Sequence, residues 1–179
     1  FTFISNLGTA RANNGEVAEA EKLHRKTIDI ALKMFGENHL YTFKAWVKLA
    51  SLYRQTEEAD KELQALEAAS RSLSGSVPEN SPVQSQRYYL LGEYWKRQGE
   101  YARAAAQMDS AVNLLWPERK ANSRESLKTA ADPLLLSDAL FQQAEIERGR
   151  LMAGGTNTEA PALEALLGSY DLAIEAVDT

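Results

Sequence analysis

Apolar side chains recur every three or four residues along most of the chain, which is the spacing of one face of an α-helix. Ile4, Leu7 and Ala10 form one such stripe, and a second stripe runs from Ala20 to Ala31. Between the two stripes lies Asn13-Asn14-Gly15, a sequence suited to leaving a helix through a left-handed residue. The pattern therefore predicts a pair of antiparallel helices joined by a tight turn.

The same pattern returns twice more at a fixed offset of 42 residues, without insertions. Small residues keep their places in the repeat, and two antiparallel helices approach closely only where the facing side chains are small. A single helical hairpin cannot bury its apolar face, so neighbouring hairpins are expected to stack. The aligned sets are Leu7-Gly8, Leu49-Ala50 and Leu91-Gly92; Arg11, Tyr53 and Trp95; Gly15, Glu57 and Gly99; and Ala20, Glu62 and Ala104.

These residues resemble the tetratricopeptide repeat. Asn6–Ala10, then Gly15, then Glu19-Ala20 match that family's consensus register, and the longer period with Phe35–His39 before the next helix is similar to the kinesin-light-chain type. The resemblance covers about residues 1–115 and implies an all-α solenoid of antiparallel hairpins in a right-handed superhelical array. The second unit departs from the consensus, because Glu57 replaces the turn glycine and Glu62 a small residue.

The whole chain, 1–179, is interpreted as one array of about four repeats with seven or eight helices and no extended strand. In the fourth repeat Asp132 is predicted to cap a helix that starts at Pro133, residues 153–158 to form a lengthened turn, and residues 160–177 the last helix. Because the chain begins with Phe1 in mid-helix pattern, it is expected to be a fragment of a longer protein. The predicted repeats span about 1–34, 43–73, 83–115 and 133–177, with linkers at 74–82 and 117–132.

Residues that could carry chemistry are few. The chain has no Cys and two His, so thiolate nucleophiles and Cys-ligated metals are excluded. His24 lies on an inner stripe and is expected to be a packed or hydrogen-bonded core residue. His39 is expected to be a loop or capping residue beside Asn38, a plausible N-cap. We therefore predict no catalytic residue, no metal, no cofactor and no enzymatic activity. Trp95 is expected in the core. For Trp46 and Trp116, a core position and a place in an aromatic binding cage are both left as alternatives.

Charge and hydropathy narrow the classes of partner. The net charge is −5, and residues 127–179 hold three basic against nine acidic side chains, which argues against nucleic acid. No apolar run approaches the ~20 residues of a membrane span, so no membrane partner is expected. The lack of Cys fits a reducing compartment, and an intracellular, cytoplasmic location is the expectation.

The resemblance implies a ligand groove lined by the first helix of each hairpin. On that face basic side chains outnumber acidic ones, although the protein is acidic, and Lys44, Arg54, Lys96 and Arg97 are expected to be exposed. We expect a protein or peptide partner, extended and acidic, with an apolar anchor for Tyr89 and Phe141. A solvated, unoccupied face is one alternative, and a regulatory or self-assembly module, including a homo-oligomer, is another. The predicted groove residues are Asn6, Thr9, Asn13, Lys44, Lys48, Arg54, Tyr89, Lys96, Arg97, Phe141 and Arg148.

Overall fold

The computed structural model describes residues 2–117 and 130–154, together with 164, 167, 168, 171, 172, 174 and 176. Within these residues the chain is α-helical and contains no strand. It divides into two compact units, Phe1–Glu79 and Asn80–Thr179. Most of the predicted linker 117–132 and most of the last predicted helix lie outside the described residues. The joining of the two units into one right-handed array stays a prediction.

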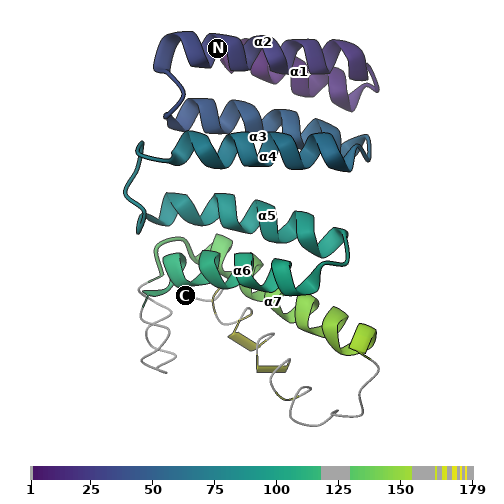
Figure 1. Cartoon of the computed structure of the whole chain (residues 1–179), viewed down its shortest axis with the longest axis vertical. Helices are drawn as coiled ribbons and strands as arrows, with labels where there is room; N and C mark the ends of the chain where they lie inside the picture. The colour runs from purple at the N-terminus through teal and green to yellow at the C-terminus, as the bar shows by residue number, and fades with distance from the viewer. Residues whose placement is uncertain are drawn as a thin grey trace. The chain divides into compact units, whose positions relative to one another are not determined.

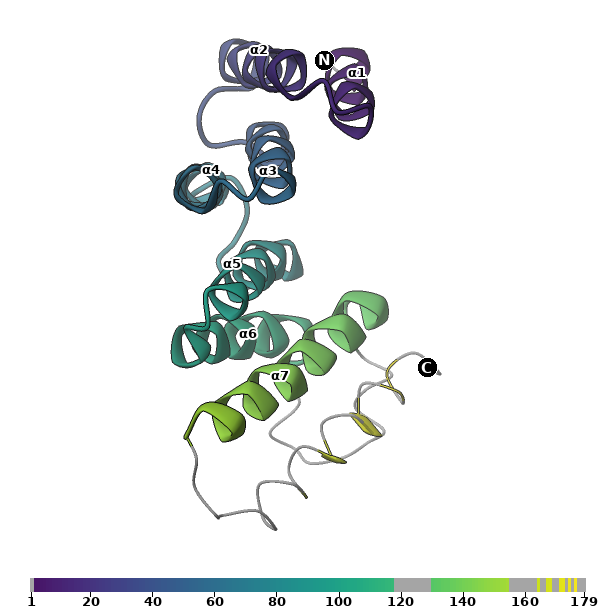
Figure 2. The ribbon, with the colours of Figure 1, turned by 90° about the vertical axis from the view of Figure 1, so that its right-hand side faces the viewer.

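The first unit consists of two antiparallel helical hairpins (Figures 1 and 2). Helix α2 packs against both α1 and α3, and α1 also contacts α3, so the first helices of the two hairpins lie next to each other. The unit buries Ile28 from α2, Phe43 and Leu49 from α3, and Leu66 from α4. Its helices are α1 (Thr2–Asn13), α2 (Val17–Phe35), α3 (Leu40–Gln55) and α4 (Ala59–Leu73).

The second unit repeats the hairpin with α5 (Ser85–Arg97) and α6 (Tyr101–Leu115), preceded by the short 3-10 turn η1 (Pro82–Gln84). Helix α6 lies between α5 and α7 (Pro133–Gly154), and α6 and α7 together supply most of the buried core. Leu172 and Ala176, from the segment predicted as the last helix, pack in this core and are helical.

The ends of α7 test two predictions from the sequence. The backbone N–H of Leu135 donates to Asp132 Oδ1 at 3.0 Å, which confirms the predicted cap before Pro133. The predicted turn from residue 153 is wrong at its start, because α7 continues to Gly154.

Three hairpin turns have the same backbone hydrogen bond, offset by 42 residues each time. The N–H of Glu16, Glu58 and Glu100 donates to the carbonyl five residues earlier, at 2.9, 2.9 and 3.0 Å. This bond closes a Schellman turn, which requires one residue with positive φ. Gly15 and Gly99 have φ of 79° and 74°, and Glu57 takes the same conformation with φ 59°. The departure at Glu57 therefore leaves the turn intact.

The link between α2 and α3 is held by side chains rather than by a long loop. His39 Nδ1 accepts from the Tyr41 N–H at 3.1 Å, so His39, and not the predicted Asn38, caps α3. The Phe35 and His39 rings stack with centroids 4.8 Å apart. The Thr42 hydroxyl donates to the carbonyl of Gly36 at 2.7 Å. These contacts fix where α3 begins relative to the end of α2.

The three tryptophans differ in burial. Trp116 is 4% exposed and belongs to the core of the second unit. Trp95 is half-buried against that core, with the Arg103 guanidinium 4.6 Å from its ring centroid. Trp46 is half-buried in the first unit, where it lines a small pocket with Asn38 and Arg71. The prediction of a packing role thus holds for Trp95, and the structure gives Trp116 the same role.

Candidate binding site

A pocket of about 290 Å³ opens in the first unit between the adjacent helices α1 and α3. It lies on the face formed by the first helix of each hairpin, and α2 reaches it with a single side chain. Its lining residues are Thr9, Ala12 and Asn13 from α1, His24 from α2, and Lys48, Ser51, Leu52, Arg54 and Gln55 from α3.

The α1 side of this pocket is built from small or polar residues. Ala12 is buried, Asn13 is exposed, and the Thr9 hydroxyl donates to the carbonyl of Ser5 at 3.2 Å. The short side chains of Thr9 and Ala12 leave space between the two helices. Asn13 offers an amide that can both donate and accept a hydrogen bond. This side is suited to contacting a peptide backbone.

His24 is the buried member of the pocket, with only 2% of its surface exposed. Its ring packs against Gly8: a Cβ atom added to that glycine would lie 2.9 Å from His24 Cε1 and 3.0 Å from Nδ1. Within the described residues, His24 Nδ1 has no hydrogen-bond partner. Burial, and then the positive charge of Lys48, lower the pKa of His24 below its ordinary value. The imidazole is therefore neutral at pH 7 and holds a buried nitrogen without a partner.

The charge of the pocket is positive. Lys48 and Arg54 are both exposed, and no Asp or Glu is among the residues that line it. A lining with two cationic side chains favours an anionic ligand, because charge-assisted hydrogen bonds to a carboxylate are stronger than neutral ones. The arrangement can bind an acidic group.

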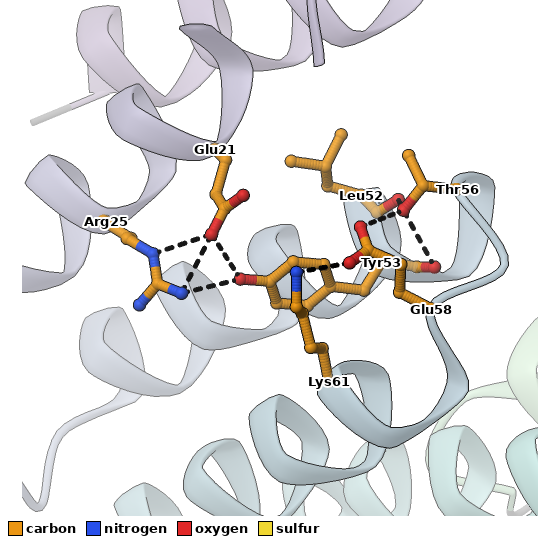
Figure 3. A network of polar contacts seen from close by, with 7 residues as sticks. All are labelled: Glu21, Arg25, Leu52, Tyr53, Thr56, Glu58 and Lys61. Atoms are coloured by element: carbon orange, nitrogen blue, oxygen red, sulfur yellow. Dashed lines mark hydrogen bonds and ion pairs between the residues drawn. The ribbon is translucent and has the colours of Figure 1, made fainter. Parts of the chain in front are cut away.

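A polar network next to the pocket fixes α3 to α2 (Figure 3). The Tyr53 hydroxyl donates to Glu21 Oε1 at 2.8 Å and accepts from the Arg25 guanidinium at 2.9 Å. Burial, and then the hydrogen bond to Glu21, raise the pKa of Tyr53 to about 12. That same hydrogen bond is the main reason that the pKa of Glu21 is lowered. Because Arg54 follows Tyr53 in α3, the network also holds the cationic side of the pocket in place.

The structure brings together four of the predicted groove residues: Thr9, Asn13, Lys48 and Arg54 line one pocket. Asn6 and Lys44 are exposed but do not line it. His24 was interpreted only as a core residue, and its burial is confirmed. Its place in the pocket was missed, although a polar residue on an inner stripe opposite a glycine was a signal for it.

In the second unit the predicted groove residues are more dispersed. Lys96 is half-buried and its ammonium donates to Gln142 Oε1 of α7, so the prediction that Lys96 is exposed is wrong. Tyr89 packs against the core of this unit. Arg148 pairs with Glu145 at 2.6 Å. Arg97 is exposed, and Phe141 is 46% exposed.

Among residues 2–117, 130–154 and the few described beyond them, no three or more His, Cys, Asp or Glu side chains gather where they could hold a metal ion. In the same part of the chain no helix has the length and apolar character needed to cross a membrane.

Comparison with known proteins identifies the repeats. The family model described as tetratricopeptide repeat matches residues 2–74. The search of curated protein sequences finds no match.

Solved structures show the same fold at low sequence identity. BtubC (BKLC) from P. vanneervenii is 16% identical, with a TM-score of 0.66 over 98% of this chain and 59% of that one. A putative kinesin light chain with nearly identical TPR-like repeats from Podosopora anserina is 17% identical, with a TM-score of 0.58 over 99% of this chain and 86% of that one. The chain thus spans less than two thirds of the first of these proteins.

The predicted fold is confirmed: the chain is an all-α protein with the fold of tetratricopeptide-type repeat proteins, including those of the kinesin-light-chain kind, and its residues 2–74 match the tetratricopeptide repeat model.

Proposed function

We propose that the chain is a protein-interaction module whose first unit binds an extended, acidic peptide segment of a partner protein. Tetratricopeptide repeats generally mediate protein–protein interaction. The observation that supports the finer proposal is the pocket between α1 and α3, which is lined by the two cationic residues Lys48 and Arg54 and by no Asp or Glu. The proposed location is inside the cell, in the cytoplasm.

The two sides of the pocket contact different parts of the peptide. Lys48 and Arg54 on α3 bind the acidic side chain, and the planar guanidinium of Arg54 can hold both carboxylate oxygens. Thr9 and Asn13 on α1 face the peptide main chain, as an extended ligand requires. The five other exposed groove residues extend the proposed contact surface within their own units; they are Asn6, Lys44, Arg97, Phe141 and Arg148. Of these, Phe141 offers the apolar anchor.

Self-assembly is the second candidate, and exposed apolar side chains favour it. Phe3 on α1 is 78% exposed, and Leu134 and Met152 on α7 are 70% and 76% exposed. Apolar side chains of this size are the usual means by which repeat arrays pack on a further repeat or another copy. Light scattering at several concentrations separates the two candidates, since self-assembly predicts a mass that grows with concentration.

Charge reversal tests the peptide-binding proposal. The probes are short Gly-Ser peptides with one Leu and spaced Glu residues, labelled with a fluorophore, and a control series with Gln in place of Glu. The wild type should bind the Glu series alone, and binding should weaken with added salt because the screening length falls to about 8 Å at physiological ionic strength. Lys48→Glu with Arg54→Glu should abolish this binding while changing the free energy of unfolding by only about 0.5 kcal/mol per site.

The matched control is Lys26→Glu with Lys33→Glu, which changes the net charge equally but affects exposed lysines of α2 outside the pocket. This variant should bind the Glu series nearly as well as the wild type. Equal loss of binding in both variants would mean that only net charge matters. Full binding by the pocket variant would rule the pocket out as the peptide site.

A further inference from the structure

We propose that His24 is a recognition residue of the pocket, one that takes up a proton when a ligand carboxylate enters, so that the peptide binds more tightly as the pH falls. This inference rests on the proposed function of the pocket and adds to it a buried ligand-sensing group. It also predicts a preference for acidic conditions that Lys48 and Arg54 alone would not produce.

The first observation is the unsatisfied nitrogen. His24 is 2% exposed, it lines the pocket, and its Nδ1 has no hydrogen-bond partner in the described part of the chain. Buried polar groups are nearly always paired, because an unpaired group loses its hydration without replacement. A neutral imidazole has one donor and one acceptor nitrogen, and both become donors when it is protonated. A carboxylate accepts hydrogen bonds only, so it complements the protonated form of the ring.

The second observation is the set of charges that surround the ring. Helix α3 contributes the cationic residues Lys48 and Arg54 to the pocket, and α1 contributes the uncharged residues Thr9, Ala12 and Asn13. On α2 itself, Glu21 and Arg25 are bound to Tyr53, and Lys22 pairs with Glu19. Without a ligand, the burial of the ring and then the positive charge of Lys48 disfavour the imidazolium and lower the pKa of His24.

A bound carboxylate reverses this balance. Its negative charge offsets Lys48 and Arg54 and stabilises a third positive charge on His24, so the pKa of His24 rises on binding. The bound state then holds more protons than the unbound state, and by linkage the affinity increases as the pH falls from the bound pKa to the unbound one. The peptide carboxylates stay ionised down to about pH 5, so the change comes from the protein.

The third observation is the fit between His24 and Gly8. Any side chain at position 8 would meet the imidazole, since a Cβ there would lie 2.9 Å from Cε1. The glycine gives the ring room to lie at the junction of α1, α2 and α3 rather than turning outward. A residue needed only to fill the core could be apolar, and would then leave no unpaired nitrogen at the pocket.

The experiment follows the affinity and the proton in the same intact chain. Binding of the fluorophore-labelled Glu peptide is measured from about pH 8 to about pH 5.5, where histidine is the side chain that ordinarily titrates. The chain holds two histidines, so two sets of imidazole signals are followed by NMR with and without the peptide. We expect about three- to tenfold tighter binding at the acidic end, since a rise of one pKa unit corresponds to a tenfold change. The peptide should raise the pKa of His24, and the signals of His39, which does not line the pocket, serve as the internal reference.

Two variants complete the test. His24→Gln keeps a polar side chain that does not titrate, so whatever its affinity at about pH 8, that affinity should not increase as the pH falls. His39→Asn is the matched control, because Asn is a good N-cap for α3 and the variant removes the other histidine; it should keep the gain in affinity at low pH in full. Peptide binding with no pH dependence, together with a His24 pKa that the peptide does not move, would overturn the inference and leave the proposed function standing. No binding of the Glu peptide at any pH would overturn both.

Discussion

Gly8 on α1 and His24 on α2 pack directly against each other in the first hairpin, so the size of the side chain at one position limits the size of the side chain at the other. The close approach of a Cβ at position 8 to the imidazole explains why a residue without a side chain stands there. The family resemblance predicted a small residue at this position for helix packing, and the structure shows the particular group that it accommodates.

A Gly8→Ala substitution should therefore destabilise the protein by about 1–2 kcal/mol through overpacking against the His24 ring. In a His24→Ala background the same change should cost much less, because the added methyl group then enters vacant space. Thermal or urea unfolding of the wild type, both single variants and the double variant measures this coupling. Additive costs would show that Gly8 is needed for another reason.

Glu57 allows a second comparison at this scale, because it takes the backbone conformation that two glycines adopt in the equivalent turns. A side chain at positive φ costs roughly 1 kcal/mol. Glu57→Gly should thus leave stability unchanged or raise it slightly, after the greater entropy of an unfolded glycine is included. Gly15→Ala and Gly99→Ala should each lower stability by about 1 kcal/mol, although neither position has any atom near the added methyl group. Urea unfolding of the three variants checks the opposite signs.

Some properties of single residues could be predicted from the sequence and others could not. The 42-residue register was enough to identify Glu57 as the turn residue and to predict that His24 is buried. It could not predict the unpaired Nδ1 of His24, which depends on every neighbour at the junction of three helices. Lys96 was predicted to be exposed, but its partner Gln142 lies 46 residues further along the chain. Contacts across such separations are not contained in a local pattern.

At the scale of helices, the sequence predicts where most elements begin and end, because their ends are set by local hydrogen bonds. The three Schellman turns follow the repeat, and Asp132 caps α7 as predicted. The prediction that Asn38 is the N-cap of α3 is wrong. His39 is the N-cap because Phe35 stacks on its ring and its Nδ1 accepts from the Tyr41 N–H. Asn38 was predicted because asparagine is one of the residue types preferred as an N-cap.

The contact of Tyr53 with Glu21 and Arg25 leads to a prediction about the packing of α3 on α2. Tyr53→Phe should destabilise the protein by about 1–2 kcal/mol at neutral pH, since it removes hydrogen bonds to charged partners. Because the pKa of Tyr53 rises from 10.0 to about 12 on folding, the folded state favours the protonated phenol. This stabilisation is complete below about pH 10 and is lost as the pH rises from 10 to 12.

The measurement is the free energy of unfolding of wild type and Tyr53→Phe between pH 8 and about pH 12. The difference between the two proteins should shrink across the upper part of this range. A constant difference would mean that the hydroxyl contributes through packing and not through its proton. Glu21→Gln serves as a control, because an amide still accepts from Tyr53 but removes the charge that Arg25 contacts.

For the whole molecule, the division into two compact units has a direct consequence for the site. Every residue that lines the pocket belongs to Phe1–Glu79, and repeat proteins are stabilised mainly by contacts between neighbouring repeats. A fragment of residues 1–79 should therefore fold, show helical circular dichroism, and bind the Glu peptide within about a factor of three of the full chain. A folded fragment without affinity would mean that the second unit supplies part of the site.

The fold class of the whole chain could be predicted from the repeat alone, since few arrangements bury the faces of three hairpins at a constant period. The arrangement of the predicted groove residues could not. Thr9, Asn13, Lys48 and Arg54 meet because α1 and α3 are adjacent, which follows from the repeat. In the second unit, Lys96 donates a hydrogen bond to a side chain of α7, and Tyr89 packs against the core. Both contacts depend on tertiary structure outside the first three repeats.

The pocket lies between two neighbouring hairpins, so a ligand bound in it contacts both hairpins and holds them together. The α1–α2 hairpin supplies Thr9, Asn13 and His24, and the next hairpin supplies Lys48 and Arg54, so the ligand is bound fully only while the two hairpins stay stacked. In a chain held together by nearest-neighbour interfaces, such a ligand adds its binding energy to one interface and leaves the others unchanged. Amide hydrogens of α1 and α3 should then exchange with solvent more slowly when the peptide is bound, whereas those of α6 and α7 should keep their rates. Ligand binding would then stiffen one interface of the first unit and leave the rest of the described chain as it was.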